Sequence, residues 1–233
     1  MAMRTRLKAG SSPAPGIIVF DMDGVLVDVA ESYRETIVRT VEHFTGHTIE
    51  RALIQRYKNE GGWNNDWELS QRLCADLGVT VEYNTVVDYF NHLFLDQGLI
   101  HRERWLPKPG FLESLASRYL LAIFTGRNLL EARITLEREG CFDRFLKITS
   151  DDVSRFKPDP EGLHQIMALH PGKELLYIGD TVDDARSARS ASVNFIGIAG
   201  GDEHLALLLE NEGAITVLTN INELEEVLCA ARP

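Results

Sequence analysis

Apolar residues in this chain occur in short continuous runs, each followed by a polar cluster. Hydrophobicity that is continuous rather than alternating is typical of strands buried on both faces, as in a parallel sheet. The sequence therefore predicts buried parallel strands at four clear runs and two weaker ones. The clear runs are 17–20, 120–124, 175–178 and 193–198, and the weaker ones are 145–149 and 214–218.

Segments with helical spacing of apolar residues separate most of these runs. One such segment stops before Gly140, and another follows Pro160, a residue suited to a first helical turn. Two more cover residues 185–191 and 205–209. Strands that alternate with helices indicate βαβ units. The predicted fold class is therefore α/β, with a Rossmann-like open parallel sheet.

Residues 28–106 break this rhythm, because they contain no convincing buried strand. Their pattern predicts about four helices, near 30–44, 49–58, 67–77 and 82–97. The segment closes at Pro107-Lys108-Pro109-Gly110, a helix breaker, and a new helix is expected to start at Phe111. We expect residues 28–106 to form an all-helical cap domain inserted into a core made of 16–27 and 107–233.

Composition narrows the possible partners and compartment. Residues 1–15 contain three basic residues but no apolar run, so we expect a flexible leader and not a signal peptide. The net charge of −11 argues against nucleic acid or an anionic membrane as a partner. Cys74, Cys141 and Cys229 are widely spaced and are expected to be buried and reduced. A cytoplasmic protein is expected, and nothing indicates an obligate protein partner.

Polar clusters follow the predicted strands at four places. In an open α/β sheet, ligands bind beyond the carboxyl ends of the strands, so these clusters should converge. Carboxylates that converge repel one another, at about 4 kcal/mol for a pair 4 Å apart at an effective dielectric of 20. A hard divalent cation would offset that repulsion, and Mg²⁺ suits oxygen ligands. The clusters are Asp21-Met22-Asp23-Gly24, Thr125-Gly126-Arg127, Lys157-Pro158-Asp159-Pro160 and Gly179-Asp180-Thr181-Val182-Asp183-Asp184.

In this order and spacing the four clusters resemble the motifs of the haloacid dehalogenase-like (HAD) hydrolase superfamily. The resemblance covers nearly the whole chain after residue 15, and residues 28–106 resemble the helical cap of one subclass. It implies that Asp21 is the nucleophile that forms an aspartyl-phosphate. It also implies that Asp23 is the general acid and base, and that Gly24 permits the tight backbone turn that lifts both carboxylates out of the strand.

The same resemblance assigns the remaining site residues. Thr125 and Gly126, with Arg127 beside them, would bind the phosphoryl group, and Lys157 would pair with Asp21 and the phosphate. Mg²⁺ would be bound by Asp21, the backbone carbonyl of Asp23 and Asp180. Asp184 would support the metal or its waters, and Asp183 is the less favoured choice for that role. The implied activity is hydrolysis of a small phosphorylated metabolite.

Each of these residues, taken singly, also has a purely structural interpretation. Asp183 or Asp184 would serve as a helix cap, and Lys157 as a solvated charge. Within the superfamily, Asp23 favours phosphoryl chemistry, because the dehalogenases lack an acid at that position. A phosphosugar mutase shares both acids and remains an alternative function. A non-catalytic protein that binds a phosphorylated ligand is a second alternative, although binding alone needs no nucleophile.

Substrate choice is expected to depend on the cap, at the segment Gly61-Gly62-Trp63-Asn64-Asn65-Asp66-Trp67. Asn64 and Asn65 are the candidates for contact with substrate, although either would also serve as a helix cap. For the two Trp residues, packing inside the cap is the favoured interpretation. Phosphonate cleavage would need a cap lysine, and Lys58 has no supporting context. A second anionic group on the substrate has three candidate partners, for which a solvated helix face is the alternative: Arg34, Arg56 and Arg72.

Overall fold

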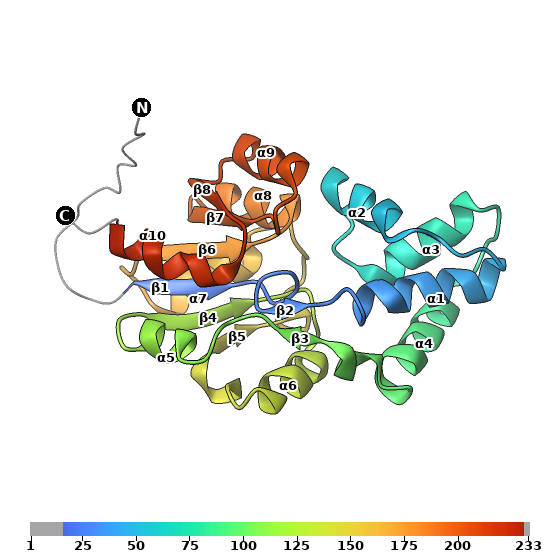
Figure 1. Cartoon of the computed structure of the whole chain (residues 1–233), viewed down its shortest axis with the longest axis horizontal. Helices are drawn as coiled ribbons and strands as arrows, with labels where there is room; N and C mark the ends of the chain where they lie inside the picture. The colour runs from blue at the N-terminus through green and yellow to red at the C-terminus, as the bar shows by residue number, and fades with distance from the viewer. Residues whose placement is uncertain (1–15, 231–233) are drawn as a thin grey trace.

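The computed structural model describes residues 16–230, and the leader predicted at 1–15 lies outside the described residues. Its main feature is a six-stranded parallel sheet in the order β5-β4-β1-β6-β7-β8 (Figure 1). The predicted α/β fold with an open parallel sheet is confirmed, and all six predicted strands are present. The strands are β1 (Ile17–Phe20), β4 (Leu120–Phe124), β5 (Leu146–Ile148), β6 (Leu175–Gly179), β7 (Asn194–Ile198) and β8 (Thr216–Leu218).

Helices cover both faces of the sheet, which explains why its strands are apolar throughout. On β1, Ile18 and Phe20 point into one apolar cluster, whereas Ile17 and Val19 point into another. The first cluster includes side chains of α5 (Phe111–Ala116), α6 (Leu129–Arg138) and α10 (Leu224–Ala230). The second includes side chains of α7 (Glu161–Leu169), α8 (Val182–Ser190) and α9 (Glu203–Asn211).

The segment expected to form the cap is helical and lies beyond one end of the sheet (Figure 1). Helix α1 packs on α3 and α4, and its apolar residues Ile37 and Val41 are fully buried. The segment predicted as one helix over 82–97 divides at residue 91 into α4 and a π-helical turn. The elements are α1 (Tyr33–Thr45), α2 (Arg51–Glu60), α3 (Asp66–Asp76), α4 (Tyr83–Asn91), the π-helix His92–Asp96 and the 3₁₀ helix Leu99–Arg102.

The chain enters and leaves these helices through a pair of adjacent short strands. Strands β2 (Val27–Asp28) and β3 (Arg104–Trp105) pair in antiparallel fashion, and the Leu106 amide donates to the Leu26 carbonyl at 3.0 Å. Neither strand was predicted, because two residues are too few to produce a periodic pattern. Both connections therefore cross from sheet to cap at a single place.

Helix α10 has no counterpart among the helices predicted from the sequence. Cys74 and Cys141 are buried as expected, but Cys229 lies exposed on α10, so that expectation is wrong for one of the three cysteines. Within residues 16–230, no helix has both the length and the apolar character needed to cross a bilayer.

The contact between α7 and β4 depends on a glycine. A Cβ atom at Gly162 would lie 2.3 Å from Cε2 of the buried Phe124 ring. We expect Gly162→Ala to lower the free energy of unfolding by about 1–3 kcal/mol, because overpacking outweighs the gain in helix propensity. Chemical denaturation would measure this, and the loss should shrink in a Phe124→Leu background. Stabilisation by Gly162→Ala, as at an open helix position, would contradict the steric argument.

Candidate active site

Strand β1 lies between β4 and β6, so the polar residues after these three strands meet at one edge of the sheet. Asp21 follows β1, Thr125 follows β4, and Asp180 follows β6. The Asp21 amide donates to the Ile178 carbonyl at 2.8 Å, which fixes Asp21 to the end of β6. The convergence of motifs predicted from the sequence is therefore present in the fold.

Asp21 is buried, and both Asp21 and Asp184 contact the amine of Lys157. Lys157 Nζ lies 2.8 Å from Asp21 Oδ1 and 2.8 Å from Asp184 Oδ1, and donates to the Tyr177 hydroxyl at 3.0 Å. Burial raises the pKa of the Asp21 carboxyl to about 7, although Lys157 opposes that shift. Burial disfavours the charged form of Lys157, but the carboxylates of Asp184 and Asp21 outweigh it and raise the pKa of the amine. Lys157 is thus a charged partner of Asp21, as the sequence predicts.

Asp180 has a carboxylate oxygen that lacks a partner. Its Oδ1 is buried and accepts no hydrogen bond within the described part of the chain. Burial and the carboxylates of Asp21 and Asp184 raise the pKa of Asp180. Gly24 makes room for this side chain, because a Cβ there would lie 1.9 Å from Asp180 Oδ2, and Gly24 adopts φ +72°. An uncompensated oxygen among other carboxylates is a reason to expect a cation at this place.

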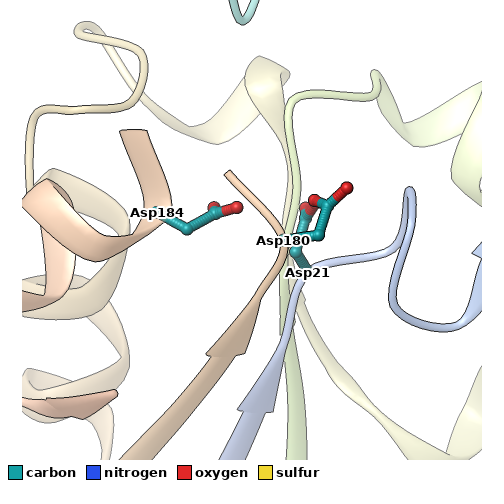
Figure 2. A group of neighbouring side chains, drawn as sticks. All are labelled: Asp21, Asp180 and Asp184. Atoms are coloured by element: carbon teal, nitrogen blue, oxygen red, sulfur yellow. The ribbon is translucent and has the colours of Figure 1, made fainter. Parts of the chain in front are cut away.

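The residues present fit a hard divalent cation. Carboxylate oxygens of Asp21, Asp180 and Asp184 all lie within 4.8 Å of one another. Figure 2 shows the carboxylates of Asp21 and Asp180 together at the ends of their strands, with Asp184 extending towards them from its helix. An all-oxygen donor set suits Mg²⁺. Asp21 and Asp180 are the side chains that would hold it.

Asp184 differs from the other two acids because its oxygens are already occupied. Oδ1 accepts from Lys157 and Tyr177, and Oδ2 accepts from the amide and hydroxyl of Thr181. These four donors match the four lone-pair positions of a carboxylate. The Thr181 contacts form the capping box of α8, so the helix start itself holds Asp184 in place. Asp184 is arranged to orient Lys157, whereas the support of the metal or its waters predicted for it stays a prediction.

Arg127 fixes the second acid of the first motif. Its Nε donates to Asp23 Oδ1 at 2.9 Å, and its Nη2 contacts the same oxygen. Both contacts are to Oδ1, so Oδ2 is the oxygen of Asp23 that can face a substrate. Asp23 side-chain exposure is 33%, whereas Arg127 side-chain exposure is 1%. The acid therefore borders the pocket while the guanidinium that holds it is buried.

The rest of the Arg127 guanidinium contacts other protein groups. Nη1 donates to Thr135 at 2.8 Å, and Nη2 lies 2.8 Å from Glu103 Oε1, in the segment just before β3. The guanidinium also stacks over the ring of Tyr33 at 4.9 Å, at the start of α1. Arg127 was expected to bind the phosphoryl group, but most of its donors are used within the protein. We infer that it positions Asp23 and joins it to both ends of the cap.

One pocket contains the acids and is lined by both sheet loops and cap helices. Asp21, Asp23, Gly126, Arg127 and Asp180 line it from the core. The predicted phosphoryl-binding residue Thr125 is buried behind this wall, and its hydroxyl accepts from the Arg127 amide at 3.2 Å. The cap supplies the opposite wall through Tyr33, Arg34, Lys58, Asn64, Asn65, Asp66, Trp67 and Phe90.

The two asparagines predicted to contact substrate have different surroundings. Asn65 caps α3, with its Oδ1 accepting from the amides of Trp67 and Glu68 at 2.9 and 3.2 Å. Its side chain also lines the pocket, but its carbonyl oxygen is committed to the helix. Asn64 lies against the Gly126 loop, where a Cβ on Gly126 would be 2.6 Å from Asn64 Nδ2. Asn64 is therefore the asparagine that brings a free amide to the phosphoryl-binding loop.

A second contact between cap and core involves Asp183, the acid disfavoured for the metal. Both of its carboxylate oxygens accept from the Gly62 amide, at 2.9 and 2.8 Å, and the residue is 3% exposed. Gly61 and Gly62 both adopt φ +80°, a conformation that favours glycine. Arg186, on the same helix α8, lies 3.4 Å from the Glu60 carbonyl. These contacts hold the loop after α2 against the helix that carries Asp184.

Sequence reasoning missed several residues of the site for identifiable reasons. Tyr177 lies within an apolar strand, and only the folded structure shows that its hydroxyl contacts Lys157 and Asp184. Glu103 is distant in sequence from any motif. Glu131 lies four residues after Arg127, outside the motif itself, and accepts from the Tyr33 hydroxyl at 2.8 Å. Lys58 has no supporting context in the sequence, yet in the structure it lines the pocket and forms an ion pair with Asp66 at 2.6 Å.

Mg²⁺ should stabilise this protein through Asp180. At about 100 times its dissociation constant, a bound ion adds roughly 2.7 kcal/mol to the free energy of unfolding. We expect Asp180→Asn to raise the stability of the metal-free protein, because it removes a buried charge, and to abolish the Mg²⁺-dependent increase. Thermal unfolding with Mg²⁺ and with EDTA measures both effects. The exposed Asp143→Asn variant is the control, and an unchanged Mg²⁺ response in Asp180→Asn would refute the site.

The Asp183 contact should hold the cap loop closed. We expect Asp183→Ala to speed amide hydrogen exchange at Gly62, because the amide loses both of its acceptor oxygens. Asp183→Asn, which retains one acceptor oxygen, should give an intermediate rate. Hydrogen exchange followed by mass spectrometry of residues 58–67 would measure this. Equal protection in the wild type and in Asp183→Ala would show that the contact does not hold the loop.

Known proteins are similar to this chain over most of its length. The chain is 30% identical over 222 residues to an imidazoleglycerol-phosphate dehydratase of Phytophthora nicotianae, with 88% of this chain and 47% of that protein covered. It thus spans about half of that relative. It is 26% identical over 200 residues to a phosphoglycolate phosphatase of Mesorhizobium japonicum, with 81% of this chain and 86% of the relative covered.

Solved structures share the fold. The crystal structure of a predicted phosphoglycolate phosphatase from Haemophilus somnus superposes with a TM-score of 0.76 at 18% identity, covering 94% of this chain and 100% of that one. The predicted enzyme class, an HAD-like phosphatase, agrees with these relatives. The family model for haloacid dehalogenase-like hydrolases matches residues 16–192. The chain therefore belongs to the haloacid dehalogenase-like hydrolases.

Proposed function

We propose that this protein is a Mg²⁺-dependent phosphatase that hydrolyses a small phosphomonoester through an aspartyl-phosphate on Asp21. The observation that carries the proposal is the pairing of Asp21 with Lys157 beside the unpartnered oxygen of Asp180. A nucleophile, a cation fixed beside it and a place for a second cation thus lie together at one edge of the sheet. The phosphoglycolate phosphatases among the relatives support the phosphatase class.

The first half of the reaction would transfer the phosphoryl group to Asp21. One Asp21 carboxylate oxygen attacks phosphorus, and the bond from phosphorus to the ester oxygen breaks. Asp23 gives a proton to the departing alcohol through its unconstrained Oδ2. Lys157 and the Gly126 amide offset the charge on the transferring group. Bound Mg²⁺ would supply further electrostatic stabilisation of the phosphoryl oxygens.

The second half would release the phosphate. Asp23, now deprotonated, accepts a proton from a water molecule, whose oxygen attacks the phosphorus of the acyl-phosphate. The bond from phosphorus to Asp21 breaks, which restores the carboxylate and frees inorganic phosphate. Arg127 holds Asp23 in the same place for both steps. The cap wall limits access of bulk water to the intermediate.

Asp21→Asn should reduce phosphate release by roughly 10⁴-fold or more, because the amide cannot act as the nucleophile. Release of inorganic phosphate from a panel of small phosphomonoesters, with Mg²⁺ and with EDTA, provides the measurement. Asp143→Asn again serves as a surface control, and circular dichroism verifies the fold of each variant. A near-normal rate in Asp21→Asn would refute the assignment.

The same panel separates the alternatives left open by the sequence. A phosphosugar mutase would isomerise its substrate and release little free phosphate. A non-catalytic protein would be protected by ligand against heat without any turnover. Metal-dependent release that is lost in Asp21→Asn is the result expected for the phosphatase.

A further inference from the structure

Arg34 is a cation in the pocket that the mechanism above does not use. It lies in the first turn of α1 and lines the pocket together with Asp21, Asp23 and Asp180. Its Nη1 is buried and has no hydrogen-bond partner within the described part of the chain. A buried charged donor without an acceptor is unfavourable unless a ligand completes it.

The guanidinium of Arg34 is held in a defined orientation. Its Nη2 donates to Gln55 Oε1 at 3.2 Å, and Gln55 in turn donates to Asn59 Oδ1 at 2.8 Å. Both partners are neutral residues of α2. The cap therefore fixes the guanidinium without neutralising its charge.

The other cations in or beside the pocket are paired with acids. Lys58 contacts Asp66 at 2.6 Å, Arg127 contacts carboxylates at 2.8 and 2.9 Å, and Lys157 contacts two carboxylates at 2.8 Å. For Arg34, no ion pair with a residue between 16 and 230 is observed within 4.0 Å. Its charge acts on Asp180 only at longer range, where it opposes the rise in the pKa of that carboxyl. Among these four cations, Arg34 is the one left to bind an anion from outside the chain.

The transferring phosphoryl group does not need Arg34. Lys157 and the loop at Gly126 would serve that group from the core side, and a metal held by Asp180 would add to them. Arg34 comes from the cap wall, where the organic part of a substrate would lie beside Tyr33, Trp67 and Phe90. A guanidinium fork is matched in shape to a carboxylate or a phosphate, and the phosphoglycolate phosphatases among the relatives favour the carboxylate.

We propose that Arg34 binds a carboxylate on the leaving-group side of the substrate, so that the substrate class is small phosphorylated carboxylic acids. This inference rests on the proposed phosphatase function. The pocket has a cavity volume of about 100 Å³, so we expect the organic part of the substrate to be small. The probe compound is 2-phosphoglycolate, which carries a phosphate and a carboxylate on two carbons.

The test compares 2-phosphoglycolate with 2-hydroxyethyl phosphate, which has a hydroxyl in place of the carboxylate. We expect Arg34→Gln to lower kcat/KM for 2-phosphoglycolate by roughly 10- to 100-fold, because a charge-assisted contact is lost. The rate with 2-hydroxyethyl phosphate should change little. Arg34→Lys, which keeps the charge but not the fork, should retain part of the activity on the acid.

A matched control comes from the same cap. Arg72 pairs with Asp76 on the surface of α3 and is not among the residues that line the pocket. Arg72→Gln should leave both substrates unaffected. As a readout independent of turnover, calorimetry should show weaker binding of 2-phosphoglycolate to Asp21→Asn/Arg34→Gln than to Asp21→Asn.

The possible outcomes separate this inference from the proposed function. Equal losses on both substrates in Arg34→Gln would show that Arg34 serves the phosphoryl group, which overturns the carboxylate assignment alone. Hydrolysis of 2-hydroxyethyl phosphate but not of 2-phosphoglycolate by the wild type would also overturn it. Release of phosphate from no phosphomonoester in the panel by folded, Mg²⁺-loaded wild type would overturn the proposed function itself.

Discussion

The arrangement of the whole site depends on the burial of like charges at the ends of two adjacent strands. Asp21 and Asp180 follow neighbouring strands β1 and β6, so their carboxylates are forced together by the register of the sheet. Lys157 compensates one side of this cluster, and Asp184 holds Lys157 in place. On the other side, Asp180 Oδ1 accepts no hydrogen bond from the described chain. The buried carboxylates at this edge would be stabilised most when a divalent cation and a phosphoryl group bind together.

Charged side chains also join the cap to the core. Arg127 occupies the point where core and cap meet, because it contacts Asp23, Glu103 and the ring of Tyr33. A movement of either connection between cap and core would therefore disturb Asp23, the proposed general acid. A second contact, of Asp183 with Gly62, joins the cap loop to helix α8. Cap and core are thus joined by two polar contacts, and both involve residues of the strand-end motifs of this chain.

Sequence alone predicted the sheet, most helices and the four acids, because each follows an apolar run or a recognisable motif. It could not predict relations between distant segments. Glu103 reaches Arg127 across 24 positions, and Tyr177 looks like one more apolar residue of its strand. Asn65 shows the limit within a single segment, since a residue that caps a helix and one that contacts substrate have the same local signal. Arg34 differs from Arg72 only through what the folded cap places beside it.

The paired strands β2 and β3 have a consequence for how such a protein can diversify. Because the Leu26 carbonyl and the Leu106 amide are hydrogen-bonded at 3.0 Å, the chain enters and leaves the helical segment at a single place. The ends of that segment are already together, so lengthening, shortening or replacing it changes little in the chain entropy of closing the core. The sheet edge that carries the acids and the cap that forms the opposite wall of the pocket are therefore separable parts of the chain. The same strand-end residues can be combined with helical segments of different length or sequence.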